Sequence, residues 1–277
     1  MQQWRGPVQS IAEQDIAQLG GHISVLHRQR RDHVRLNGYL NELAATAQAQ
    51  QGPILLAMYR LVFPHAFAEE AVLWPVMRRV LSDGHQLTLK VEQEHQAINE
   101  LVTRLEGLAP GSAERGEVLT RVIGLLCEDV RDEENELLPR LQARLSPLQL
   151  KLLGIVWEVI RRIAPTRAHP IVSRRPPGNV LSALPLSLLD RSRDRVDALR
   201  NRQASQSPVL SAVSRALAKA SHAVEQLPGF GIGEDPDTRV AERPRSWAGL
   251  VALVGGVAAS GVFVFMARRR VVRPKAV

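Results

Sequence analysis

Length, composition and charge already exclude several classes of protein. The chain has 277 residues, 45% hydrophobic but only 4% aromatic, and a single cysteine, so it can form a helical core but no internal disulfide. Its net charge of +8 is uneven: residues 1–145 carry 15 basic and 19 acidic side chains, and residues 146–277 carry 21 and 9. A slightly acidic part followed by a basic one argues against a nucleic-acid-binding protein, which would be basic throughout.

The spacing of apolar residues predicts five helices in the first 163 residues. We expect the first over residues 20–48, the second from Pro53 to about 82, the third over about 85–108, the fourth over about 113–145 and the fifth over 147–163. Pro64 and Pro75 should bend the second helix, because proline lacks the backbone N–H that a helix interior uses. Four long helices joined by short loops predict an all-α, up-down-up-down four-helix bundle.

Residues after 164 are predicted to be less regular. The prolines of PTRAHP and RRPPGN indicate extended connections, two further helices are expected over 180–202 and 208–227, and residues 229–238 should form a flexible linker. The predicted organisation is an N-terminal segment (1–20), a bundle with its fifth helix (21–165), a basic extension (166–245), a transmembrane helix (246–267) and a basic tail (268–277).

The prediction of a transmembrane helix rests on residues 247–267, which include no charged side chain. A run of this length can cross the hydrocarbon core of a bilayer, about 30 Å, and the arginines at 268–270 would anchor it. The alternative is a buried core helix. Because no secretory signal is present, we expect a single-pass membrane protein with its bundle in the cytoplasm, and Gly255, Gly256 and Ala259 would offer a surface for a homodimer.

A short stretch occurs twice with the same pattern of acidic residues and proline. HAFAEEAVLWP begins at His65 and DVRDEENELLP begins at Asp129, with Glu-Glu at the fifth and sixth positions of each. Because positions i and i+4 of a helix share a face, His65 projects with Glu69, and Asp129 projects with Glu133. One imidazole and one carboxylate on a shared face supply half of a typical iron or manganese site.

Each copy of this stretch follows a further histidine on the preceding helix. His33 comes after Asp32 and His95 comes after Glu94, so an acidic residue precedes the histidine in both cases. The unit of a histidine, a long gap and a His/Asp-x-x-x-Glu motif therefore occurs twice, offset by 62 to 64 residues. Two helix pairs that deliver the same residues inward predict a pseudo-symmetric site for two metal ions.

These residues resemble the hemerythrin-like, HHE cation-binding family over roughly residues 20–145. The match rests on His33, the His65-x-x-x-Glu69 motif with its trailing LWP, His95 and the second motif around Glu133. The run APTRAHP…RPPGN and the helix after it resemble the extension of some actinobacterial members. The resemblance implies a hemerythrin-like bundle around a non-haem centre of two iron ions and chemistry with O2, NO or peroxide; manganese is the alternative metal.

At one position the chain departs from that family, because Asp129 stands where the family pattern has histidine. The expected metal ligands are therefore three histidines and three carboxylates: His33, His65, Glu69, His95, Asp129 and Glu133. The additional negative charge favours Fe(III) or manganese. It should also lower the reduction potential, which favours one-way oxidation or peroxide turnover over reversible O2 carriage.

The expected function is that of a membrane-anchored di-iron protein that binds, senses or scavenges O2, NO or peroxide. If the protein is an enzyme, the expected activity is the processing of peroxide or NO at the di-iron centre. The alternatives for the site are a metal-free bundle, a mononuclear or zinc site, and His27 as an additional ligand. The alternative for the protein is a metal-free or mononuclear scaffold at the membrane, whose basic residues 174–227 bind anionic lipid or a partner helix.

Other polar residues are expected to have simpler roles. Four histidines should be structural or exposed: His22, His85, His169 and His222. Three glutamates should be solvated: Glu70, Glu134 and Glu136. The alternative for Glu70 and Glu134 is that they accept hydrogen bonds from the metal ligands. Cys127 should pack inside the bundle as a small apolar residue.

Overall fold

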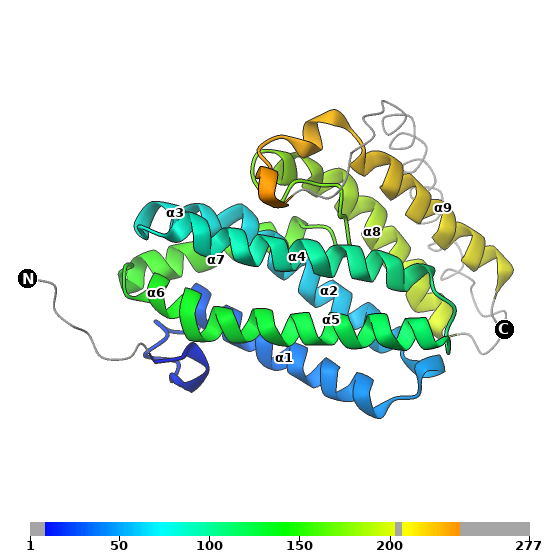
Figure 1. The fold of residues 1–277 in the computed structure, drawn as a ribbon, viewed down its shortest axis with the longest axis horizontal. Helices are drawn as coiled ribbons and strands as arrows, with labels where there is room; N and C mark the ends of the chain where they lie inside the picture. Colours follow the sequence, from blue (N-terminus) through cyan, green and yellow to red (C-terminus); the bar gives the residue numbers. More distant parts are fainter. Residues whose placement is uncertain (1–8, 203–206, 239–277) are drawn as a thin grey trace, which may run out of the picture.

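The computed structural model of the chain describes residues 9–202 and 207–238, and these form helices joined by short connections. In chain order the α-helices are α1 (Val25–Ala45), α2 (Gly52–Ala68), α3 (Trp74–Val80), α4 (Gly84–Gly107), α5 (Ala113–Asp132), α6 (Leu138–Gln142), α7 (Pro147–Ile163), α8 (Gly178–Arg202) and α9 (Pro208–Glu225). Figure 1 shows α1, α2, α4 and α5 aligned along one direction, and α1 packs against α2 as α4 packs against α5. The predicted all-helical bundle is confirmed.

Local sequence signals explain where several of these helices begin. The hydroxyl of Ser24 accepts a hydrogen bond from the Leu26 amide at the start of α1, and Ser112 does the same for Arg115 in α5. Ser146 and Gln149 form a reciprocal capping box at the start of α7. These caps satisfy backbone N–H groups that have no partner within the helix.

The apolar side chains of the bundle form two separate clusters along its length. One contains Leu36 of α1 and Leu126 of α5, and the other contains Leu26 of α1 and Leu137 just beyond α5. In the four helices that carry them, the predicted metal ligands lie along the chain between a residue of one cluster and a residue of the other. The polar site therefore lies between two apolar layers.

Two π-helical turns interrupt what the sequence predicts to be continuous helices. They span Glu69–Leu73, between α2 and α3, and Glu133–Leu137, between α5 and α6. A proline follows each turn, at Pro75 and Pro139, and its missing N–H leaves the carbonyl four residues earlier without its usual helical partner. Wider π-turns are frequent at functional sites, and each of these begins at a predicted metal ligand.

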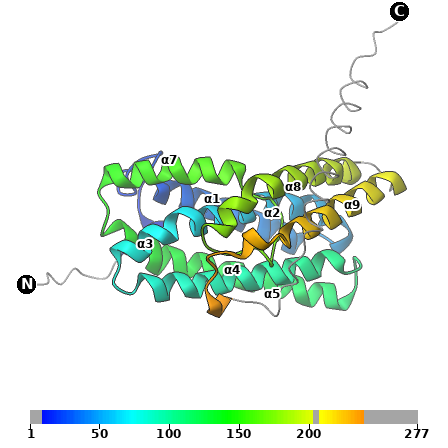
Figure 2. The same ribbon diagram turned by 90° about the horizontal axis from the view of Figure 1, so that it is seen from above.

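The helices after α6 cover one side of the bundle. In the sequence order, α7 packs against α1 and α2, and α8 packs against α2 and α9. Seen from above in Figure 2, α7 and α8 follow one another along one edge of the molecule, with α5 on the opposite edge. The pair α1 and α2 is thus covered on its outer side by α7 and α8, and the pair α4 and α5 is not covered by these two helices.

The prediction of a flexible linker at 229–238 is wrong. Phe230 is buried, and its carbonyl accepts a hydrogen bond from the Ser173 amide. The carbonyl of Ile232 accepts a hydrogen bond from the amide of Gly178. A side chain at position 178 would not fit, because its Cβ atom would lie 2.6 Å from the same oxygen. Because its backbone groups are paired with the start of α8, this segment is a packed part of the extension.

The predictions of a transmembrane helix and of a single-pass membrane protein are corrected. Across residues 9–202 and 207–238, none of the helices combines the length and the apolar character that crossing a bilayer requires. Long helices such as α8 carry charged side chains along their length. The stretch 247–267, on which those predictions and the homodimer surface depended, lies outside the described residues.

Candidate metal centre

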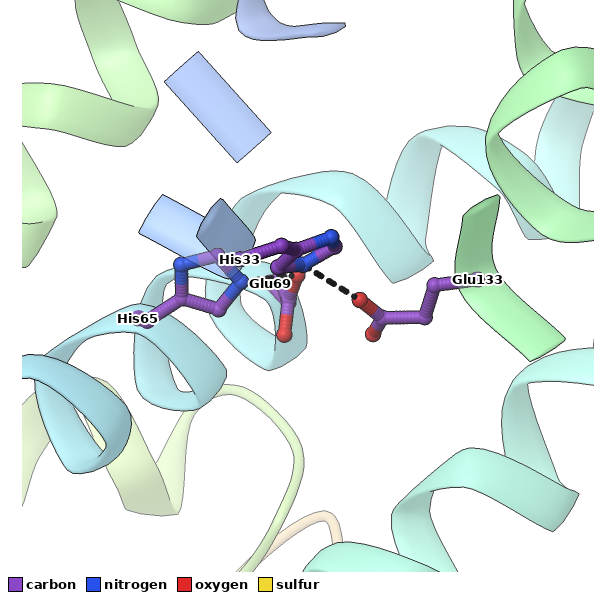
Figure 3. A group of neighbouring side chains, drawn as sticks. All are labelled: His33, His65, Glu69 and Glu133. Carbon is purple, nitrogen blue, oxygen red and sulfur yellow. Dashed lines mark ion pairs between the residues drawn. The ribbon is translucent and has the colours of Figure 1, made fainter. Parts of the chain in front are cut away.

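The structure brings all six residues of the predicted ligand set to one place inside the bundle. Their side-chain atoms form two groups, each within 4.8 Å of one another: His33, His65, Glu69 and Glu133, and His95, Asp129 and Glu133. Glu133 belongs to both groups, so it joins them. Figure 3 shows the four side chains of the first group pointing toward a common centre.

Histidine nitrogens face carboxylate oxygens across this centre. His65 Nε2 lies 3.0 Å from Glu69 Oε1 on the same helical face, and His33 Nε2 lies 3.2 Å from Glu133 Oε2. His95 Nε2 lies 3.4 Å from Asp129 Oδ1. The i, i+4 spacing read from the sequence therefore places His65 and Glu69 together, and α4 brings His95 to the same depth as α5 brings Asp129.

The atoms that face the centre are buried and make no hydrogen bond. They are His33 Nε2, His65 Nε2, His95 Nε2, Asp129 Oδ1, Glu133 Oε1 and both carboxylate oxygens of Glu69. These atoms face one another, so a shared proton or cation is needed to offset the cost of burying them. A set of three imidazoles and three carboxylates fits iron or manganese ions in this position.

The opposite ring nitrogens point outward, to carboxylates that surround the centre. His33 Nδ1 lies 2.9 Å from Glu134 Oε1, and His95 Nδ1 lies 3.0 Å from Glu70 Oε1. Glu134 follows Glu133 of the second helix pair but contacts His33 of the first. Glu70 follows Glu69 of the first pair but contacts His95 of the second, so each half supplies an acceptor for a histidine of the other. A carboxylate at Nδ1 fixes the proton there and leaves Nε2 free to bind a metal.

These contacts decide alternatives that the sequence leaves open. Glu70 and Glu134 are acceptors for histidines, whereas Glu136 is exposed. Sequence reasoning missed Asp32, whose Oδ2 lies 3.5 Å from His65 Nδ1. The acidic residue before each histidine was the available signal, but only the fold shows which histidine it contacts.

The charges of the centre depend strongly on one another in the absence of metal. Burial opposes protonation of His65 and His33, but carboxylates outweigh it: Glu69 and Asp32 raise the pKa of His65 to about 10, and Glu133 and Glu134 raise that of His33 to about 9. Burial and the charge of Glu69 raise the pKa of Glu133 to about 8. Protons thus occupy the positions that a cation would take, so metal binding should release protons.

Asp129 changes the surroundings of the second half. In the first half Asp32 contacts the ring of His65, but the corresponding Glu94 faces Asp129, which has no N–H to donate. Glu94 Oε2 is buried without a hydrogen bond, and burial together with the charge of Asp129 raises the pKa of Glu94. The substitution therefore leaves Glu94 without a histidine partner, and its Oε1 lies 3.7 Å from Lys90 Nζ instead.

The other histidines and Cys127 lie elsewhere. His22, His85 and His222 are exposed, and His27 contacts His22 rather than the centre. His169 is buried between Asp190, at 2.9 Å, and Glu225, at 3.5 Å, which confirms a structural role. Cys127 was expected inside the bundle but is exposed, because its position on α5 faces a surface pocket next to α1.

A cavity of about 30 Å³, partly open to the outside, lies against the centre. Its wall combines predicted ligands, such as His65 and His95, with apolar side chains, such as Phe63 and Ile98. A much larger pocket of about 490 Å³ opens on the surface between α1 and α5. The two share four lining residues: His33, Leu36, Leu126 and Val130.

The fold is a helical bundle, and inside it lies a buried cluster of histidines and carboxylates that could hold metal ions. Residues 24–141 match the family described as the hemerythrin HHE cation binding domain. This match agrees with the resemblance read from the sequence, and residues 1–23 and 142–277 lie outside it.

One curated relative supports the same assignment at low identity. An uncharacterised hemerythrin-like protein of Schizosaccharomyces pombe is 23% identical over 134 residues, which cover 48% of this chain and 66% of that protein. The chain thus spans just under two thirds of that relative. No solved structure matches the chain.

Proposed function

We propose that the protein is a non-haem di-iron protein that binds a small oxidant at this centre. The observation that carries the proposal is the convergence of buried, unpartnered ligand atoms in two groups that share Glu133. One group would hold one ion and the second group the other, with manganese as the alternative to iron. Bound iron would supply the electrons exchanged with O2, NO or peroxide.

The residues around the centre favour a small reactant. The cavity of about 30 Å³ exceeds the ~10–15 Å³ that one water needs, so it can take a reactant of a few atoms. Phe63, Ile98 and Leu61 make its wall largely apolar, which suits O2 or NO. Leu36, Leu126 and Val130 line both this cavity and the surface pocket, so their movement would admit the reactant.

Asp129 favours a consuming reaction over reversible carriage. Its carboxylate adds negative charge at a position where the family pattern has a neutral imidazole, and that charge stabilises the more oxidised metal. Glu94, whose pKa is raised beside Asp129, can hold a proton at the edge of the centre. We infer that the protein senses or scavenges its reactant and does not store it.

An anaerobic titration of the full chain with Fe(II) tests the proposal directly. We expect two ions per chain, and then distinct optical changes when O2, NO or H2O2 is added separately to the loaded protein. Binding should also raise the melting temperature, because a ligand that binds only the folded state stabilises it. A chain that takes up no metal and melts at an unchanged temperature would instead be a metal-free scaffold.

A further inference from the structure

Two arginines from beyond the hemerythrin-like domain reach inward toward the centre. Arg161 lies in α7, and Arg174 lies in the segment 164–177 that connects α7 to α8. Both follow residue 141, where the family match ends. The side chain of Arg174 is only 8% exposed and that of Arg161 20%, so neither is an ordinary surface charge.

Arg161 contacts the carboxylate that holds His65. Its Nη1 lies 3.5 Å from Asp32 Oδ2, the same oxygen that faces His65 Nδ1. The guanidinium is fixed by Glu158, at 3.0 Å, and lies over the ring of Trp157 at 5.3 Å. Trp157 in turn meets the His65 ring edge to face, with centroids 5.3 Å apart. One helix therefore supports both the ring of His65 and its acidic partner.

Arg174 performs the same task for His95. Its Nη1 lies 3.6 Å from Glu70 Oε1, the oxygen that faces His95 Nδ1. Its Nη2 donates to the carbonyls of His169 and Val172, at 2.8 and 3.1 Å. The backbone of the connecting segment thus holds the guanidinium in place.

We propose that Arg161 and Arg174 are positioning residues that tie the metal centre to the C-terminal extension. Each neutralises a buried carboxylate and holds it at the Nδ1 atom of a ligand histidine, so the extension controls how firmly His65 and His95 are presented. The inference rests on the proposed function, because it assumes that these histidines bind metal. It assigns the extension a role within the site and removes Arg174 from any surface that could bind lipid.

The physical reason is the density of negative charge around the centre. Three carboxylates belong to the predicted ligand set, and four more surround it: Asp32, Glu70, Glu94 and Glu134. A buried carboxylate needs a compensating charge, and an arginine supplies one while its planar fork restrains the direction of the group. Arg31 holds the Oδ1 atom of Asp32, at 2.9 Å, whereas Arg161 lies beside Oδ2, the oxygen that faces His65. Without Arg161, the oxygen at the imidazole therefore loses its arginine partner.

Titration of the full chain with Co(II) alone, followed in the visible spectrum, measures this effect. We expect Arg174→Met and Arg161→Met each to weaken Co(II) binding by about 10-fold, the lower end of the effect of an outer partner of a ligand histidine. The ligand-field bands should shift as well, because the imidazole changes its orientation. Arg175→Met and Arg104→Met are the matched controls: their guanidinium groups pair with Glu92 and Glu114, which contact neither Arg161 nor Arg174, and both variants should bind Co(II) like the wild type.

Double-mutant cycles show whether the arginines act through the carboxylates. In a Glu70→Gln background, Arg174→Met should add less than about twofold to the loss of affinity, and Arg161→Met should behave likewise in an Asp32→Asn background. If a Met variant fails to fold, Arg174→Lys replaces it. The lysine keeps the charge but cannot contact two carbonyls and Glu70 together, so binding should still weaken.

The outcomes separate this inference from the proposed function. Wild-type affinity and spectrum in the arginine variants, or losses that add fully to those of the carboxylate variants, would overturn the positioning role while the metal site stands. A wild-type chain that binds no Co(II) would refute the metal site itself.

Discussion

The two helix pairs of the bundle carry the same residues in different surroundings. In α1 and α2, Asp32 and His65 face one another, and α7 and α8 cover the outside. In α4 and α5, Glu94 lies near Asp129 instead, and its carboxylate contacts Lys90 rather than a ligand histidine. The two copies of one motif therefore differ in what surrounds their ligands.

The support differs in kind as well as in extent. Arg161 neutralises Asp32, which lies in α1, and Arg174 neutralises Glu70, which lies in the π-turn after α2. Among the described residues, no arginine forms an ion pair with the corresponding Glu94 or Glu134. The comparison indicates that arginines of the extension support one histidine of each half, His65 through Asp32 and His95 through Glu70, whereas Glu94 and Glu134 have no such partner in the described part of the chain.

The largest effect should follow from removing the residue that the halves share. Glu133 belongs to both ligand groups, so Glu133→Ala should weaken metal binding by more than about 100-fold, the upper end of the effect of outer-sphere changes. Metal content after gel filtration and a calorimetric titration would measure the loss. Glu136→Ala, an exposed change three residues later, is the control, and equal metal content in both variants would remove Glu133 from the ligand set.

A second substitution should make the two halves alike. Asp129→His would provide a ring N–H that can donate a hydrogen bond to Glu94. It would also remove one negative charge from the centre. We expect the reduction potential of bound iron to rise by roughly 60 mV, a tenfold change for one electron, with slower autoxidation. Glu128→His makes the same change of charge at an exposed position of α5. An unchanged potential and autoxidation rate in Asp129→His would show that Asp129 is not a ligand.

A smaller, pH-dependent effect tests the covering segment without involving the metal. Burial opposes protonation of His169, but the neighbouring carboxylates of Asp190 and Glu225 outweigh burial and raise its pKa to about 10. Because the folded-state pKa lies above the unfolded value of about 6.5, this stabilisation is complete below pH 6.5 and is lost as pH rises toward 10. The free energy of unfolding of the wild type, relative to His169→Gln, should fall by at most about 1.4 kcal/mol per pH unit across this range.

Chemical denaturation of the metal-free chain at several pH values would measure this difference. His85→Gln removes an exposed histidine and controls for the substitution. A difference that stays constant from pH 6.5 to 10 would show that His169 carries no stabilising charge in the folded state.

Much of the bundle was predictable because helical periodicity and capping are local properties. The helices around Leu36, Leu101 and Leu126 follow from apolar spacing, and Ser146 marks the start of α7. The π-turns at Glu69 and Glu133 were not predicted, since they depend on packing around the two prolines. The linker prediction at 229–238 failed for a similar reason: its order comes from backbone pairing with residues far away in the chain.

Local spacing is enough to show which ligands share a face, because residues four apart on any helix project together, as His65 does with Glu69 and Asp129 with Glu133. The groups that support these ligands come from other helices. The contacts of Asp32 with His65 and of Arg174 with Glu70 join residues 33 and 104 positions apart. Such pairs depend on how separate helices pack, and no local pattern records that packing.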